Sequence, residues 1–307
     1  MNYSPFSLTT IYYCRFYFRK SWITVVILLL FPYLVSWALG SGEKQAFMEA
    51  VRYSNDPAVI QQFIVEGLDV NGRDGYGKTV LMNAAQHTLN PNVIKVLLKN
   101  GAKIDERDGY GRSALIMAAR YNQNPAVIQA LLDWGADIHE KDGYNETALV
   151  WAIKENKNFA VIQIILQNGG IVEDRSGYGY TVLMRAVQYN SNPAVIEALI
   201  KNGPDIHGKD GYNETALIWA VKETNNPDII QILLDNGANV NDLNKFGDSA
   251  LMLAVRLNKV NVVLVLLEAI PDITIKNDEG RTVWDLMVEN KNLEDSEIIL
   301  RLNNLSS

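Results

Sequence analysis

Apolar residues recur along most of this chain in two helix-length clusters that return every 34 residues. In one copy, Ala114, Leu115, Ala118 and Ala119 fall at the spacing of one helix face, and the segment 127–132 has the same spacing. A polar stretch separates the two clusters, and a glycine follows the second. The pattern predicts a repeating unit made of a turn, a helix, a short loop and a second helix.

Helix start and stop signals frame both predicted helices. Ser113 can accept a hydrogen bond from a free backbone N–H at the start of the first helix. Asn124 and Pro125 begin the second, because asparagine caps well and proline is pre-organised for the first helical position. Gly135 can end that helix in the left-handed conformation. Equivalent glycines end the other second helices: Gly67, Gly101, Gly169, Gly203 and Gly237.

A turn phrase opens each unit and fixes the register of the repeat. Its closing hydroxyl residue returns every 34 residues, with a last step of 33: Thr79, Ser113, Thr147, Thr181, Thr215, Ser249 and Thr282. One unit cannot bury its apolar face alone, so neighbours must stack into a solenoid. We expect a repeat domain over 41–307, with an N-terminal cap at 43–74, six full units over 75–277 and a C-terminal cap at 278–307. The full units, here numbered 1 to 6, start at positions 75, 109, 143, 177, 211 and 245.

The repeated phrase resembles the ankyrin repeat. Asp-x-x-Gly-x-Thr-x-Leu leads into Ala-Ala and then into a helix that ends Leu-Leu-x-x-Gly-Ala-Asp, closely matched at 135–138 and 237–240. The resemblance covers 43–307 and implies an all-α, ankyrin-like solenoid of stacked helix-loop-helix units with short β-hairpin turns. It also implies recognition of other proteins. The family's Thr-Pro-Leu-His is replaced at 79–82 by Thr-Val-Leu-Met, so apolar packing is expected where the family uses a histidine.

A longer period runs through the shorter one. Pro-Ala-Val-Ile occurs at 57–60, 125–128 and 193–196, and Trp151 and Trp219 are also 68 residues apart. This pattern indicates growth by duplication of a pair of units. The surface of the stack should therefore alternate between two chemistries.

The N-terminal segment predicts export or anchoring. Residues 1–20 are basic and aromatic, and the segment 21–40 contains a run of 18 uncharged residues, from Trp22 to Leu39. The segment 21–40 fits a cleavable signal peptide, because small residues precede position 41, or a single transmembrane anchor, because its length is near the minimum for spanning. Cations before the run and none just after it predict that the repeat domain lies outside the cytoplasm in either case.

Charge and cysteine content limit the kinds of partner and site that the chain can have. Three of the 28 basic residues and none of the 35 acidic ones lie in the first 40 positions, so the remainder carries a net charge of −10. A repeat domain this acidic should repel phosphate backbones, which argues against nucleic acid as a partner. Cys14 is the only cysteine, so the repeats offer neither a disulfide nor a thiolate metal site. We expect a monomer that binds one or more proteins, needs no cofactor, and meets the membrane through 21–40 if that segment is uncleaved.

Aromatic residues at the hairpin tips are the first candidate binding residues. An aromatic ring offers a large contact area at low entropic cost. Two interpretations stay open, since each ring can anchor a partner or can pack along the next hairpin and hold the stack together. The rings are Tyr76, Tyr110, Tyr144, Tyr178, Tyr212 and Phe246.

The first helices supply a second set. Trp151 and Trp219 occupy one helical position in units 3 and 5, and Tyr121 and Tyr189 lie near the ends of the helices in units 2 and 4. Large residues on a surface that stacking does not need to fill suggest a binding patch. The alternative places both tryptophans between helices.

Nothing in the repeats predicts catalysis or a metal site. His139 and His207 are two units apart, roughly 20 Å at usual helix spacings, which is too far to share one metal ion. Glu146 and Glu214 are likewise too far apart for an acid–base pair. We therefore expect a non-catalytic protein-binding scaffold. The alternatives are an inhibitor or immunity-type protein that neutralises a secreted enzyme or toxin, and a secreted effector.

Overall fold

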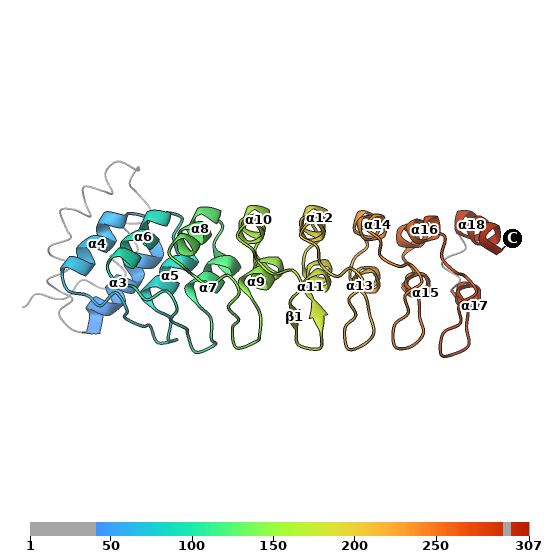
Figure 1. Cartoon of the computed structure of the whole chain (residues 1–307), viewed down its shortest axis with the longest axis horizontal. Coiled ribbons are helices and arrows are strands. Elements are labelled where there is room, and N and C mark those ends of the chain that lie inside the picture. The colour runs from blue at the N-terminus through green and yellow to red at the C-terminus, as the bar shows by residue number, and fades with distance from the viewer. Residues whose placement is uncertain (1–40, 291–295, 307) are drawn as a thin grey trace, which may run out of the picture.

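The computed structural model describes residues 41–290 and 296–306, and this part of the chain forms an extended ribbon of two helix rows (Figure 1). The first-helix row contains α3 (Ser41–Tyr53), α5 (Val80–His87), α7 (Ala114–Tyr121), α9 (Ala148–Glu155), α11 (Val182–Tyr189), α13 (Ala216–Glu223), α15 (Ala250–Arg256) and α17 (Val283–Glu289). The second-helix row contains α4 (Pro57–Val65), α6 (Pro91–Lys99), α8 (Pro125–Asp133), α10 (Phe159–Gln167), α12 (Pro193–Lys201), α14 (Pro227–Asp235), α16 (Val260–Glu268) and α18 (Ser296–Ser306). The predicted all-α solenoid is confirmed.

Local capping explains where these helices begin and end. Ser113 Oγ accepts the Ile116 N–H at 3.2 Å, and Asn124 Oδ1 accepts the Ala126 N–H at 3.0 Å. Gly135 has a φ of +88°, a left-handed conformation that costs an L side chain energy. The predicted caps and the glycine stop are confirmed in this unit.

The core lies between the two rows and repeats with the sequence. In the six full units, one leucine of each first helix is almost completely buried: Leu81, Leu115, Leu149, Leu183, Leu217 and Leu251. In units 1 to 5, one isoleucine of each second helix is buried as well: Ile94, Ile128, Ile162, Ile196 and Ile230. Because each core layer needs the units on both sides, the stack is stabilised by nearest-neighbour contacts.

Short hairpins project from the first-helix row, on the side away from the second helices (Figure 1). In unit 4 the hairpin contains β1 (Arg175–Ser176) and β2 (Tyr180–Thr181), which pair antiparallel. Single bridges join Arg73 to Thr79 and Leu243 to Ser249 at equivalent places. The rigid double row thus presents its hairpin tips along one edge.

The predicted signal or anchor at 21–40, and the basic segment 1–20 before it, lie outside the described residues. Among the described helices, none is both long and apolar enough to span a bilayer.

Candidate protein-binding surface

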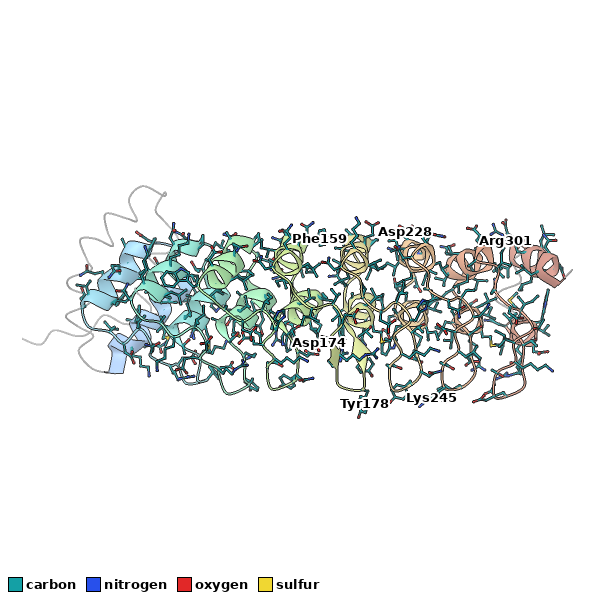
Figure 2. All side chains as sticks on the ribbon, viewed as in Figure 1. Phe159, Asp174, Tyr178, Asp228, Lys245 and Arg301 are labelled. Carbon is teal, nitrogen blue, oxygen red and sulfur yellow. The ribbon has the colours of Figure 1, made fainter. Side chains whose placement is uncertain are left out.

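The hairpin-tip aromatics form an exposed row, here called the tip row. Tyr76 exposes 76% of its surface, and the least exposed member, Tyr212, still exposes 40%. Figure 2 shows Tyr178 and Lys245 at the hairpin edge of the ribbon, opposite Phe159 and Asp228 on the second helices. The full row is Tyr76, Tyr110, Tyr144, Tyr178, Tyr212 and Phe246. All of these residues except Tyr212 therefore expose more than half of their surface.

A polar side chain at the base of the hairpin, a carboxylate in four units and an amide in unit 6, holds five of the six tips in shape. In unit 3, Asp142 Oδ1 accepts hydrogen bonds from the Tyr144 N–H at 2.9 Å and the Glu146 N–H at 3.1 Å. The residue between them, Asn145, has a φ of +61°, a conformation that asparagine tolerates better than most side chains. Asp74, Asp108, Asp210 and Asn244 accept the same two bonds in their hairpins. The backbone that carries these five rings is thus fixed before any partner arrives, and the hairpin of Tyr178 is closed by the pairing of β1 with β2.

The two first-helix tryptophans, predicted as candidate binding residues, are almost fully buried and present little surface to a partner. Trp151 and Trp219 expose only 6% and 7% of their surfaces. The Trp151 Nε1–H donates to Asp142 Oδ2 at 2.8 Å. The Trp219 Nε1–H donates to Asp210 Oδ2 at 2.9 Å. Their indole N–H groups are satisfied by the second oxygen of the carboxylate that shapes the hairpin. Each ring also contacts the preceding unit, Trp151 through Arg120 at 4.0 Å and Trp219 through Tyr180 at 5.3 Å between ring centres.

The same position reaches the same hairpin in other units through different chemistry. Asn83 Nδ2 donates to Asp74 Oδ2 at 3.2 Å, and Arg185 Nε donates to Ser176 Oγ at 3.3 Å. In each case the helix residue lies nine positions after the hairpin residue. Helix and hairpin are therefore braced within most units by one polar contact, whose residues change from unit to unit.

Cations and rings alternate along the first-helix row of units 2 to 4. The Arg120 guanidinium lies 4.0 Å from the centre of the Trp151 ring. The Lys154 ammonium lies 4.5 Å from the centre of the same ring and 5.4 Å from the centre of the Tyr189 ring. The Arg185 guanidinium lies 4.3 Å from the centre of the Tyr180 ring. Such contacts attract a cation to the ring face. Each ring in this series already has a partner within the chain.

Ion pairs neutralise these cations. Lys154 meets Glu146 at 2.8 Å, and Arg120 forms two bonds to Glu155, at 2.7 and 2.9 Å. Tyr121, beside Arg120, is half-buried, whereas Tyr189 exposes 46% of its surface. Of the four first-helix aromatics predicted to bind a partner, Tyr189 is therefore the one that presents a large free area.

A row of basic residues ties successive hairpins together, and sequence reasoning missed it. Arg107 Nη1 donates to the Gly111 carbonyl of its own hairpin at 2.8 Å and to the Lys141 carbonyl of the next at 2.7 Å. Arg73 and Arg175 make the equivalent pairs of bonds. A signal was present, because a cation returns at this place in five successive hairpins: Arg73, Arg107, Lys141, Arg175 and Lys209.

Glu140 is a buried acid beside this row of basic residues, and its pKa is raised. Its side chain is only 7% exposed, it meets Arg107 at 3.2 Å, and it accepts a hydrogen bond from the Ser113 hydroxyl. Burial raises the pKa of Glu140 to about 7, and Arg107 only partly offsets this. A group that joins two units thus titrates near neutral pH.

The histidines and the exposed tryptophan add no further chemistry. His139 and His207 lie exposed in turns, and the described residues contain no cluster of His, Cys, Asp or Glu able to hold a metal ion. Trp134 ends α8 and exposes 41% of its surface, away from the tip row. The geometry supports contact with a macromolecule along one edge.

Stacked helix pairs with protruding hairpins define a solenoid repeat protein that presents a recognition edge. A family model described as "Ankyrin repeats (3 copies)" matches residues 47–142, 139–210 and 183–277, and the chain belongs to the ankyrin-repeat family. The crystal structure of the human ASB11 ankyrin repeat domain is similar, with a TM-score of 0.64 and 24% identity over 73% of this chain and 96% of that one. That likeness shows the fold. No curated protein sequence gave a significant match.

Proposed function

We propose that this chain is a non-catalytic scaffold that binds a partner protein along the tip row. The observation that carries the proposal is the exposure of all six tip rings on hairpins whose backbone is fixed in advance, by a polar side chain in five units and by the β1–β2 pair in unit 4. Rigid binding loops lose little entropy on association. The ankyrin family, whose repeats generally serve as protein-binding scaffolds, supports the same conclusion.

The composition of the tips favours a protein ligand. Five of the six rings are tyrosines preceded by glycine, and in units 3 and 5 an asparagine follows the ring. Tyrosine, glycine and asparagine are the residues enriched in antibody binding loops, where tyrosine supplies rigid amphipathic area and the small residues supply adaptable hydrogen bonds. The first five tips carry no charge between the glycine and the residue after the ring, so shape and aromatic contact would dominate recognition.

We place this activity outside the cytoplasm. Support comes from the charge pattern around the uncharged run in 21–40, which fits a signal peptide or a single anchor. If the segment is cleaved after Gly40, the repeats are released, as a secreted effector requires. The net charge of −10 over the rest of the chain favours a basic partner, which suits an inhibitor of a secreted enzyme or toxin.

Affinity capture tests the scaffold proposal. The full-length chain is compared with a variant in which Tyr76, Tyr110, Tyr144, Tyr178 and Tyr212 are changed to alanine. The matched control carries Trp134→Ala and Leu89→Ala, which remove exposed apolar area elsewhere. We expect a saturable partner that the tip variant loses and the control retains, with all three proteins showing the same helical circular dichroism. Equal capture by the tip variant and the control would refute the tip row as the binding surface.

A further inference from the structure

Asparagine side chains in the loops between the two helices of each unit tie neighbouring units together. Asn122 Nδ2 donates to the Thr88 carbonyl at 2.7 Å, and Asn156 Nδ2 donates to the Asn122 carbonyl at 2.8 Å. Each of these amides also reaches a carbonyl at the end of the preceding first helix. The loop carbonyls of units 1 and 2 are therefore satisfied by the next unit along the chain.

This ladder fails at the junction of units 3 and 4. Asn190 Nδ2 reaches only the Ile153 carbonyl, at 3.4 Å. The Asn156 carbonyl accepts no hydrogen bond from the residues that the structure describes. Asn158 caps its own helix through Oδ1 and also donates Nδ2 to the Gln123 carbonyl at 2.7 Å. Its counterpart Asn192 makes the same cap, but among the described residues its Nδ2 reaches no carbonyl of unit 3. The junction thus offers unfilled backbone acceptors.

A cavity of about 390 Å³ opens at this junction, between the loops that precede α10 and α12. Phe159, Ile162 and Val195 give it apolar walls, and Tyr189 lines it from the end of α11. Its polar lining includes Asn156 and Asn190, so the unfilled acceptor belongs to a lining residue. We call this cavity the junction socket. Apolar walls around a few polar groups are typical of a ligand site.

The chain itself shows which group the equivalent acceptors take. Two units further along, Lys259 Nζ donates to the Lys222 carbonyl at 3.0 Å and to the Thr224 carbonyl at 2.9 Å. These residues lie 68 positions after Lys154 and Asn156, both of which line the junction socket. Lys259 is the residue before α16, as Asn192 is the residue before α12. One junction thus contains its own ammonium group, and the other holds the same backbone without it.

We propose that the junction socket receives a lysine side chain of the partner protein. The ammonium would take the place that Lys259 Nζ occupies two units away, and the aliphatic stem would lie against Phe159 and Val195. The net charge of −10 over the repeats favours a basic partner. At the rim, the opposing Lys154 is already paired with Glu146 at 2.8 Å, and Lys157 is exposed to solvent. This inference rests on the proposed scaffold function and names the chemistry of one contact.

A small probe tests the socket without knowledge of the partner. N-acetyl-lysine methylamide is titrated into the full-length chain by ligand-observed NMR, beside N-acetyl-norleucine methylamide, which has the same stem without the ammonium. We expect a Kd on the order of 1 mM for the lysine probe. Binding of the norleucine probe should be at least about tenfold weaker, because the charge-assisted hydrogen bonds are missing. Equal binding of the two probes would overturn the proposal.

Two matched variants locate the site. Asn192→Lys places an ammonium before α12 as Lys259 does before α16, and should abolish binding of the lysine probe. Asn226→Lys makes the same change one unit further on, with the same loss of an asparagine cap, and should leave binding intact. Equal probe binding by the two variants would place the site elsewhere.

The two proposals fail separately. The lysine probe requires no partner, so its binding can fail while capture through the tip row succeeds, which leaves the scaffold and removes the socket. The socket can likewise bind the probe when alanine changes in the tip row leave capture unchanged. Once a partner has been captured, the Asn192→Lys variant should bind that partner about tenfold or more weakly than the Asn226→Lys variant does.

Discussion

The tip row carries an aromatic residue in each of the six full units and the first-helix row carries tryptophan in two of them, units 3 and 5, yet the two rows use their rings in opposite ways. Tyr178 and Tyr76 project from their hairpins and expose about three quarters of their surfaces (72% and 76%). Trp151 and Trp219 expose less than a tenth and give their N–H groups to buried carboxylates. The difference lies in burial: a buried ring whose N–H group is satisfied stabilises the stack, whereas an exposed ring stays available for contact with a partner.

Loss of a buried tryptophan should give the largest effect on stability. Trp151→Ala removes a ring that fills its unit and leaves Asp142 Oδ2 without its donor, so we expect a loss of about 3–5 kcal/mol in the free energy of unfolding. Urea unfolding followed by circular dichroism measures it. A loss below about 1 kcal/mol would mean that the ring contributes little to the unit and would return it to the candidate binding residues.

Glu140 is a buried acid at the hairpin edge, and Glu140→Gln tests how its ionisation affects stability. The pKa of Glu140 is about 7 in the folded protein, above its ordinary value of 4.5, so folding favours the protonated form. The contribution of Glu140 to the free energy of unfolding should therefore be largest below pH 4.5. It should fall by roughly 3 kcal/mol as the pH rises through 7. Glu140→Gln should remove that slope, measured as the unfolding free energy from pH 5 to 8. Glu106→Gln, at the same place one unit earlier, should retain it, and an unchanged slope in Glu140→Gln would contradict the assignment.

Asp142→Asn tests the brace between hairpin and helix. The amide oxygen can still accept the two turn bonds, but the amide nitrogen cannot accept the Trp151 N–H, so we expect a loss of about 1–3 kcal/mol. Asn244→Asp is the reciprocal control. Asn244 already caps its hairpin, and the helix residue nine positions later is Leu253, which has no donor. That change should therefore shift stability much less, and equal losses in the two variants would argue against the brace.

Removal of a tip ring should affect stability least. Tyr76→Ala takes away a side chain that is mostly in solvent, and we expect a change within about 0.5 kcal/mol. The same substitution should weaken binding of a captured partner if that partner reaches unit 1. A destabilisation near that of Trp151→Ala would show that the ring packs along the next hairpin and holds the stack, the alternative that the sequence left open.

The fold could be predicted because its signals are local and repeated. The Ser113 cap, the Asn124-Pro125 start and the Gly135 stop each act within a few residues, and the structure has them in the expected roles. The placement of Trp151 could not be predicted in the same way. A ring on a first helix can face solvent or its own hairpin, and the choice depends on a carboxylate oxygen nine residues earlier that the turn leaves unused.

The hairpin ladder was missed for a different reason. The cations at Arg73 and Arg107 were visible at unit spacing, but a charge in a turn gives no sign of whether it faces solvent or the next carbonyl. The junction socket likewise depends on which Asn side chains reach across, and Asn190 lies in the same Asn-x-Asn pattern as Asn156. Whether a side chain reaches the next unit depends on how closely the two units pack, and the sequence does not give that distance.

A stack of this kind carries tension in series, so every junction bears the same load. Gly143 N–H donates to the Tyr110 carbonyl at 2.9 Å, and Gly211 N–H donates to the Tyr178 carbonyl at 2.8 Å, but no equivalent bond joins Tyr144 to Gly177 in the described chain. The junction of units 3 and 4 therefore lacks this tie on the hairpin edge as well as the amide tie on the loop edge. Pulled from its two ends, the molecule should part there first, near its midpoint, into two half-stacks.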